Sequence, residues 1–120
     1  TTDKPKGGSS MYFMRGGSFD NLGQYDKAIN DFNAGLSINP DDERFLSNRG
    51  VLLFNQFKNY KEALSDFSKA ISINPTGEYY INRSRCYYML GDIAKARQDV
   101  QSAIEKGSVV SSDYRKLMGL

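Results

Sequence analysis

Three arginines recur at a constant interval, and their type and spacing are the strongest suggestion of chemistry in the chain. Arg15, Arg49 and Arg83 are separated by 34 and 34 residues, and such a row of guanidinium groups could bind an anionic partner. A row of carboxylates runs in parallel with it, 16 or 17 residues further along: Asp31, Asp66 and Asp99. The spacing favours structural ion pairs between the two rows over an anion-binding ladder.

The chain is poorly supplied with catalytic and metal-binding side chains. Its 120 residues include no histidine and one cysteine, Cys86, so Ser-His-Asp and Cys-His arrangements and histidine zinc sites cannot form within it. We therefore expect no enzyme activity, no metal and no cofactor. The lone thiol is expected to pack as a small apolar residue and is compatible with a reducing compartment; a cytoplasmic location is favoured, although the sequence does not identify the compartment.

Charge and hydropathy argue against two classes of partner. The chain has 16 Lys and Arg against 14 Asp and Glu, a net charge of +2 that is scattered along the sequence, which does not make a nucleic-acid footprint. The longest aliphatic and aromatic run, 51–54, has four residues, whereas a membrane span needs about 20. The sequence begins at Thr1 without a secretory signal, and we expect a segment of a longer protein with a flexible leader over 1–8.

Two kinds of segment recur at intervals near 34 residues. YDKAINDFNAGLSINP (25–40) returns as YKEALSDFSKAISINP (60–75), and 93–108 repeats its small and apolar positions. Apolar residues in these segments share one helical face, and a second segment carrying the arginine precedes each of them. Asn-Pro and Leu-Gly pairs end the helices. We predict helices near 9–22, 25–38, 43–57, 60–73, 77–90 and 93–106, and a terminal helix over 112–119. The domain 9–120 then comprises repeats of about 9–42, 43–76 and 77–108.

This pattern resembles the tetratricopeptide repeat (TPR) family. The matching positions are Tyr12, Gly16, Leu22, Gly23, Tyr25, Ala28, Phe32, Gly35 and Pro40 in the first repeat, Leu46, Gly50, Tyr60, Ala63, Phe67, Ala70 and Pro75 in the second, and Tyr80, Ser84, Leu90, Gly91, Ile93, Ala96, Val100 and Ala103 in the third. The third departs most, with Ile93 for tyrosine, Val100 for phenylalanine and no closing proline at Ser108. The resemblance implies an all-α, right-handed superhelical solenoid of antiparallel helix pairs, three repeats plus a short C-terminal capping helix.

The resemblance further implies a concave groove, lined by the first helix of each repeat, that binds a peptide or helix of a partner protein. Helical spacing places eight residues on the stripe that would line it: Phe13, Arg44, Val51, Phe54, Asn55, Arg85, Tyr88 and Met89. Asn48 and Asn82 complete the expected groove set. Aromatic side chains would anchor the partner while asparagines bond its backbone. Alternatively, these side chains fill the inner curve of a short superhelix, or the chain is a structural or self-associating unit that forms a homo-oligomer. RNA binding is a further, less favoured alternative.

One TPR subclass binds the C-terminal carboxylates of heat-shock chaperones through a clamp of lysines, asparagines and an arginine. Carried over position by position, only Asn48 matches this clamp. The other four positions hold Phe13, Gly17, Glu78 and Asn82. The sequence therefore argues against a chaperone-tail binder and favours a non-catalytic module that binds a different protein segment.

Overall fold

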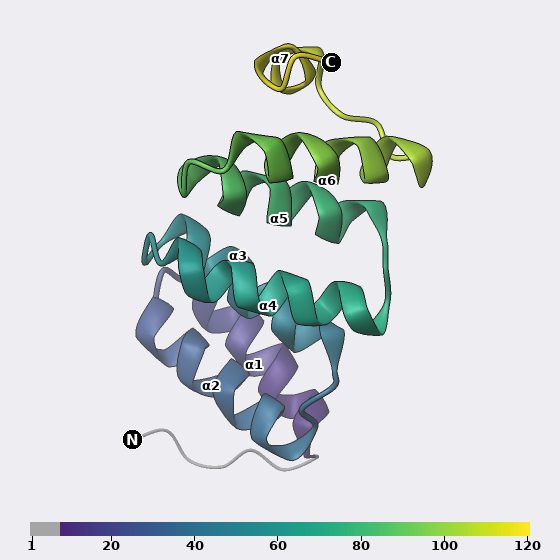
Figure 1. The fold of residues 1–120 in the computed structure, drawn as a ribbon. Coiled ribbons are helices and arrows are strands. Elements are labelled where there is room, and N and C mark those ends of the chain that lie inside the picture. The colour runs from purple at the N-terminus through teal and green to yellow at the C-terminus, as the bar shows by residue number, and fades with distance from the viewer. Residues whose placement is uncertain (1–7) are drawn as a thin grey trace.

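The computed structural model describes residues 8–120, which form seven α-helices and no strand. In chain order these are α1 (Ser9–Asn21), α2 (Tyr25–Ile38), α3 (Glu43–Asn55), α4 (Tyr60–Ile73), α5 (Gly77–Met89), α6 (Ile93–Glu105) and α7 (Ser112–Leu117). The first six stack as three antiparallel hairpins and α7 lies beyond α6 at the end of the stack, which makes an elongated body of 48 × 24 × 20 Å (Figure 1). The predicted all-α fold of repeated helix pairs is confirmed.

Side-chain caps define most of the helix starts. Asp42, Asn59, Thr76, Asp92 and Ser111 each precede a helix and accept a hydrogen bond from a backbone N–H of its first turn. Such caps satisfy one of the donors that a helix leaves free at its N-terminus. The helices begin where polar capping residues meet the apolar pattern.

The helix ends follow the glycine and proline signals with small corrections. Gly23 and Gly91 adopt positive φ angles of 75° and 87° directly after the first and fifth helices, a conformation that glycine adopts without strain. The third helix ends at Asn55 rather than 57, because the chain turns there through Lys58 with a φ of 54°. The terminal helix ends at Leu117 rather than 119, because Gly119 takes a φ of 74°. The expected leader lies outside the described residues, apart from Gly8.

Close helix crossings depend on a glycine facing a phenylalanine ring. A Cβ atom placed on Gly16 would lie 2.6 Å from Cε1 of Phe32, and one placed on Gly50 would lie 2.8 Å from Cζ of Phe67. Gly35 is similarly close to the ring of Phe45 across the boundary between the first two repeats. No room for a methyl group exists at these crossings, which explains the small residues in the repeat.

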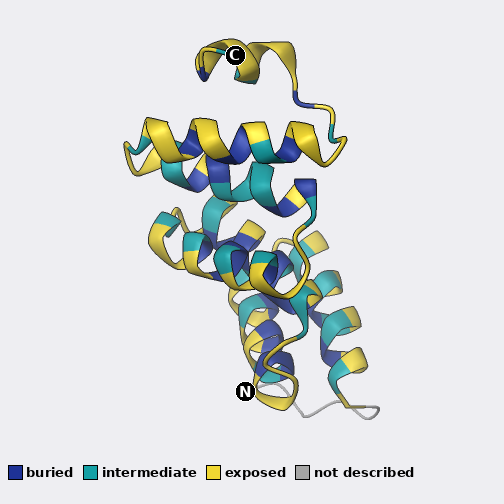
Figure 2. Ribbon diagram, turned by 45° about the vertical axis from the view of Figure 1, so that its right-hand side comes forward, coloured by how far each residue is buried: buried dark blue, intermediate teal, exposed yellow. Residues whose placement is uncertain are grey.

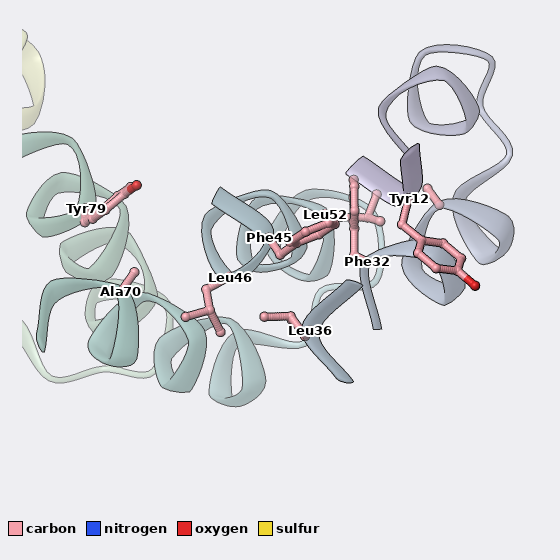
Figure 3. Close-up of a cluster of buried hydrophobic side chains, with 9 residues drawn as sticks. Tyr12, Phe32, Leu36, Phe45, Leu46, Leu52, Ala70 and Tyr79 are labelled. Carbon is pink, nitrogen blue, oxygen red and sulfur yellow. The ribbon is translucent and has the colours of Figure 1, made fainter. Parts of the chain in front are cut away.

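The core continues from one repeat into the next. Phe32 and Phe45 pack edge to face with ring centroids 6.3 Å apart, and the cluster they belong to extends from Tyr12 in the first repeat to Tyr79 in the third (Figure 3). Buried residues accordingly lie between helices, whereas exposed ones cover the outer surfaces (Figure 2). Each repeat thus buries its apolar face against its neighbour, which is how solenoids are stabilised.

The third repeat is completed by a side chain from α7. Val100 stands where the first two repeats have phenylalanine, and Ser84 replaces the glycine opposite it. The Ser84 hydroxyl lies 2.7 Å from the carbonyl oxygen of Ala96 and 2.8 Å from the hydroxyl of Tyr114. Tyr114 reaches this position from α7 and packs, together with Met118, against the last helix pair.

Candidate functional site: two faces of the helix stack

Each of the three periodic arginines forms a bidentate ion pair with an aspartate of the following helix. Nε and Nη2 of each guanidinium donate to the two carboxylate oxygens at 2.7 to 2.9 Å, in the pairs Arg15–Asp31, Arg49–Asp66 and Arg83–Asp99. The carboxylate side chains are 1%, 7% and 5% exposed, whereas the arginine side chains are 27%, 27% and 21% exposed. A buried carboxylate requires such a partner, so each pair links the two helices of one repeat.

Two of these arginines also bond to the preceding repeat. Nη1 of Arg49 donates to the Asn33 side-chain oxygen at 2.9 Å, and Nη1 of Arg83 donates to the Ser68 hydroxyl at 3.5 Å. The hydrogen bonds to the aspartates raise the pKa of Arg49 and of Arg83 above its ordinary value. Both guanidinium groups therefore remain charged, and they join neighbouring repeats as well as paired helices.

Five of the predicted groove residues surround one small cavity. Val51, Phe54 and Asn55 line it from α3, and Asn82 and Arg85 line it from α5. Its volume is about 60 Å³, and its lining also includes the buried ring of Phe67 from α4. The cavity is therefore lined by apolar side chains together with two amides and a guanidinium.

Arg85 is the charged group of this cavity. Its side chain is exposed and, among residues 8–120, makes no hydrogen bond or ion pair. It therefore differs from Arg15, Arg49 and Arg83, each of which pairs with a buried aspartate. A carboxylate reaching this face would find a cation that no acid within residues 8–120 neutralises.

Phe13 and Arg44 lie apart from the cavity and contact one another. The Arg44 guanidinium lies 4.8 Å from the centre of the Phe13 ring, and that ring packs edge to face on Phe45 at 5.3 Å. Arg44 also pairs with Asp42 at 2.9 Å, and this hydrogen bond lowers the pKa of the Asp42 carboxyl below its usual value. Part of the predicted groove set thus contributes to the packing of α1 on α3.

The remaining groove candidates differ in how far they are available to a partner. Tyr88 is half-buried against the cluster of the last repeat, Met89 is 47% exposed and Asn48 is half-buried on α3.

Phe67 is the member of the cavity that the spacing did not identify. The sequence identifies Phe67 only as a position of the repeat pattern, and the three-dimensional arrangement shows that its ring also lines the cavity between α3 and α5.

A larger hollow of about 420 Å³ lies between α2 and α4. Its lining includes Asn33, Arg49, Leu53 and Glu62, which come from three consecutive helices. An adjoining hollow of about 170 Å³ shares Arg49 and extends toward Pro40. The surface formed by α2 and α4 is thus indented at the Arg49–Asp66 ion pair, the central one of the three.

The described part of the chain offers little for a metal or a reactive thiol. No group of three or more Cys, Asp or Glu side chains in residues 8–120 is arranged to hold a metal ion. Cys86 is completely buried, and burial raises its pKa to about 12. Within the same residues, no helix combines the length and hydrophobicity that crossing a bilayer requires.

Comparisons with known proteins agree with the repeat pattern. A family model described as TPR repeat matches residues 21–56, and one described as Tetratricopeptide repeat matches residues 44–76. No curated protein sequence matches the chain. These two matches overlap and cover the centre of the helix stack, including the central ion pair.

Three solved structures illustrate the likeness in fold. The first TPR of Spaghetti (RPAP3), bound to the HSP90 peptide SRMEEVD, superposes with a TM-score of 0.85 at 20% identity over 92% of this chain and 90% of that one. The Arabidopsis OM64 TPR domain gives 0.84 at 18% identity over 92% and 93%. MamA gives 0.82 at 21% identity over 91% of this chain and 60% of its own.

Proposed function

The chain belongs to the tetratricopeptide repeat family, and we propose on this basis that it is a non-catalytic module whose first-helix face binds an extended segment of a partner protein. The cavity between α3 and α5 is the observation that carries this proposal. It combines apolar side chains with two amides and a guanidinium that is unpaired within residues 8–120, which is the composition of a site that anchors one side chain and orients a backbone.

The size and charge of the cavity define the segment that it would take. An apolar cavity of about 150 Å³ holds benzene, so about 60 Å³ suits a small aliphatic side chain better than an aromatic ring. Arg85 would pair with a carboxylate close to that side chain, and Asn55 and Asn82 would bond the peptide backbone. We therefore infer that the partner presents an aliphatic residue next to an acidic one.

This site differs in chemistry from a chaperone clamp. The RPAP3 domain that shares the fold is bound to the HSP90 peptide SRMEEVD, whereas four of the five clamp positions here hold Phe13, Gly17, Glu78 and Asn82. Glu78 would repel a peptide carboxylate where the clamp supplies a cation. We expect SRMEEVD to bind this chain at least about tenfold more weakly than a peptide selected for it.

Selection from a random peptide display library, followed by fluorescence anisotropy with the selected peptides, tests the proposal. We expect the peptides to share an aliphatic and an acidic residue, and Arg85→Gln to weaken their binding about tenfold or more. Phe54→Ala should weaken it as well, because it removes one wall of the cavity. Arg97→Gln, which removes an exposed charge from α6, is the matched control and should leave binding unchanged.

Circular dichroism melting of each variant separates lost binding from lost folding. The proposed site would be contradicted if the selected peptides bound the folded Arg85→Gln and Phe54→Ala variants with the same affinity as the parent protein. Equal affinity for SRMEEVD would contradict the expectation that Phe13, Gly17, Glu78 and Asn82, at the clamp positions, do not hold a C-terminal peptide carboxylate.

A further inference from the structure

The three ion-paired arginines differ in what covers the faces of their guanidinium groups. The guanidinium carbon (Cζ) of Arg15 lies 5.8 Å from the ring centre of Tyr12 and 5.7 Å from that of Phe19. Arg83 lies in the same way 5.6 Å and 5.7 Å from those of Tyr80 and Tyr87. The first and third repeats thus surround the arginine with two aromatic rings of the same helix, an arrangement that favours a cation.

The second repeat lacks both rings. The positions equivalent to the aromatic pair hold Leu46 and Leu53, and no aromatic ring among residues 8–120 lies over Arg49. Leu53 is smaller than Phe19 or Tyr87, and the hollow of about 420 Å³ opens beside it. Arg49 and Glu62 both line this hollow, and their equivalents Arg83 and Lys95 both contact the Tyr87 ring in the third repeat.

A second substitution at the same place changes the charge at the rim. Lys27 lies over the ring of Phe19 and Lys95 over the ring of Tyr87, each at 5.6 Å. The equivalent residue in the second repeat is Glu62, which lines the hollow and is exposed. Among the described residues its carboxylate forms no ion pair, so it can accept a hydrogen bond from an incoming donor.

Arg49 is held in a fixed orientation at the base of the hollow. Nε and Nη2 bond the two oxygens of Asp66, and Nη1 bonds Asn33. These bonds lie in the plane of the guanidinium and leave its face for stacking, which is the way in which arginine contacts aromatic rings. The side chain is 27% exposed, so a ligand can reach that face without breaking the ion pair.

We propose that the hollow between α2 and α4 binds a tyrosine side chain of a partner protein. The ring lies on the face of Arg49, beside Leu53, and its hydroxyl donates a hydrogen bond to the Glu62 carboxylate. The partner ring takes the place that the Tyr87 ring has in the third repeat, and Glu62 makes a hydrogen-bond donor preferable to a plain phenyl ring. This surface is separate from the cavity of the first helices and gives the domain a second point of attachment.

A titration of the ¹⁵N-labelled protein with N-acetyl-L-tyrosinamide, followed by NMR, tests this site. We expect saturable shifts of the amide signals of Asn33, Leu53 and Ser65, which lie around the hollow. N-acetyl-L-leucinamide, which has no ring to stack on the guanidinium, is the ligand control and should bind about tenfold more weakly. Shifts confined to the first-helix face, or equal shifts with both compounds, would overturn the proposal.

Three variants locate the binding within the hollow. Leu53→Tyr supplies the missing ring from within the chain and should abolish the shifts. Glu62→Gln, at an exposed position where unfolding is not a concern, should weaken binding about tenfold because it removes a charged acceptor. Tyr87→Leu should open a hollow beside Arg83, but Lys95 stands there in place of Glu62, so N-acetyl-L-tyrosinamide should bind this second hollow more weakly than the one beside Arg49.

The outcome with Glu62→Gln decides the question even if Leu53→Tyr fails to fold. Undiminished binding to Glu62→Gln, or to a folded Leu53→Tyr variant, would refute the proposed position of the ring. Phe54→Ala should have no effect on these shifts, which distinguishes this site from the peptide cavity.

Discussion

The adjacent glycines of α1 provide a direct test of the packing, because the same substitution should have a different effect on stability at the two positions. Gly16 faces the second helix, and a Cβ atom there would lie 2.6 and 2.9 Å from two carbons of the Phe32 ring. Gly17 faces away, and a Cβ atom there would meet nothing within 4 Å. Alanine is therefore excluded at Gly16 by its surroundings and accommodated at Gly17.

The size of the effect follows from two contributions. Alanine stabilises a helix interior by about 0.8 to 1.0 kcal/mol relative to glycine, and this gain applies to both sites. At Gly16 the added methyl group must displace the Phe32 ring, which is 1% exposed, and overpacking of this kind costs about 1 to 3 kcal/mol. We expect Gly17→Ala to be more stable than the parent by nearly 1 kcal/mol, and Gly16→Ala to be less stable than Gly17→Ala by about 1 to 3 kcal/mol.

Urea unfolding monitored by circular dichroism measures this difference, with the slope of the transition checking that both variants unfold as the parent does. Gly50→Ala repeats the test in the second repeat, where the added methyl group would lie 2.8 Å from the Phe67 ring. If Gly16→Ala were as stabilising as Gly17→Ala, the close contact between α1 and α2 would be refuted.

Two further predictions concern buried polar groups. Arg83→Met should destabilise the fold by about 3 kcal/mol, because Asp99 is then left unpaired at 4% exposure. This is the lower end of the range for breaking a buried pair, since Arg83 is itself partly exposed. Urea unfolding measures the loss, and a loss as small as that of the surface control Arg97→Met would contradict a structural role for the ion pair. Because burial raises the pKa of the Cys86 thiol to about 12, iodoacetamide should alkylate the native protein at pH 8 at least about a hundredfold more slowly than the urea-unfolded chain, and rapid alkylation of the native protein would show that the thiol is accessible.

The repeated fold could be predicted from the sequence because its signals are local. Helix starts coincide with capping residues such as Asp42 and Asn59, and two helix ends coincide with Gly23 and Gly91, which adopt the left-handed conformation. Gly50 and Phe67 follow Gly16 and Phe32 of the first repeat by 34 and 35 residues, so one contact implies the other. These features depend on residue type and spacing, which the sequence contains in full.

The details of the candidate sites depend on side-chain conformation and could not be predicted in this way. Helical spacing places Phe13 and Phe54 on one stripe, yet Phe13 packs on Phe45 while Phe54 lines a cavity. The contribution of Phe67 to that cavity requires knowing how α4 lies relative to α5. A face can be predicted from the sequence, whereas the division of its residues between packing and binding requires their positions in space.

The chain departs from the repeat pattern at Val100 and at Leu53, and the two departures have different structural consequences. Val100 lacks the ring of its equivalents, and the chain supplies Tyr114 from α7, whose hydroxyl lies 2.8 Å from that of Ser84. Leu53 also lacks a ring, but a hollow of about 420 Å³ opens beside it. Filling the hollow internally would need only the tyrosine that the third repeat already has at the equivalent position. An opening that retains a fixed guanidinium at its base and Glu62 at its rim is therefore better explained by a ligand from another molecule than by incomplete packing.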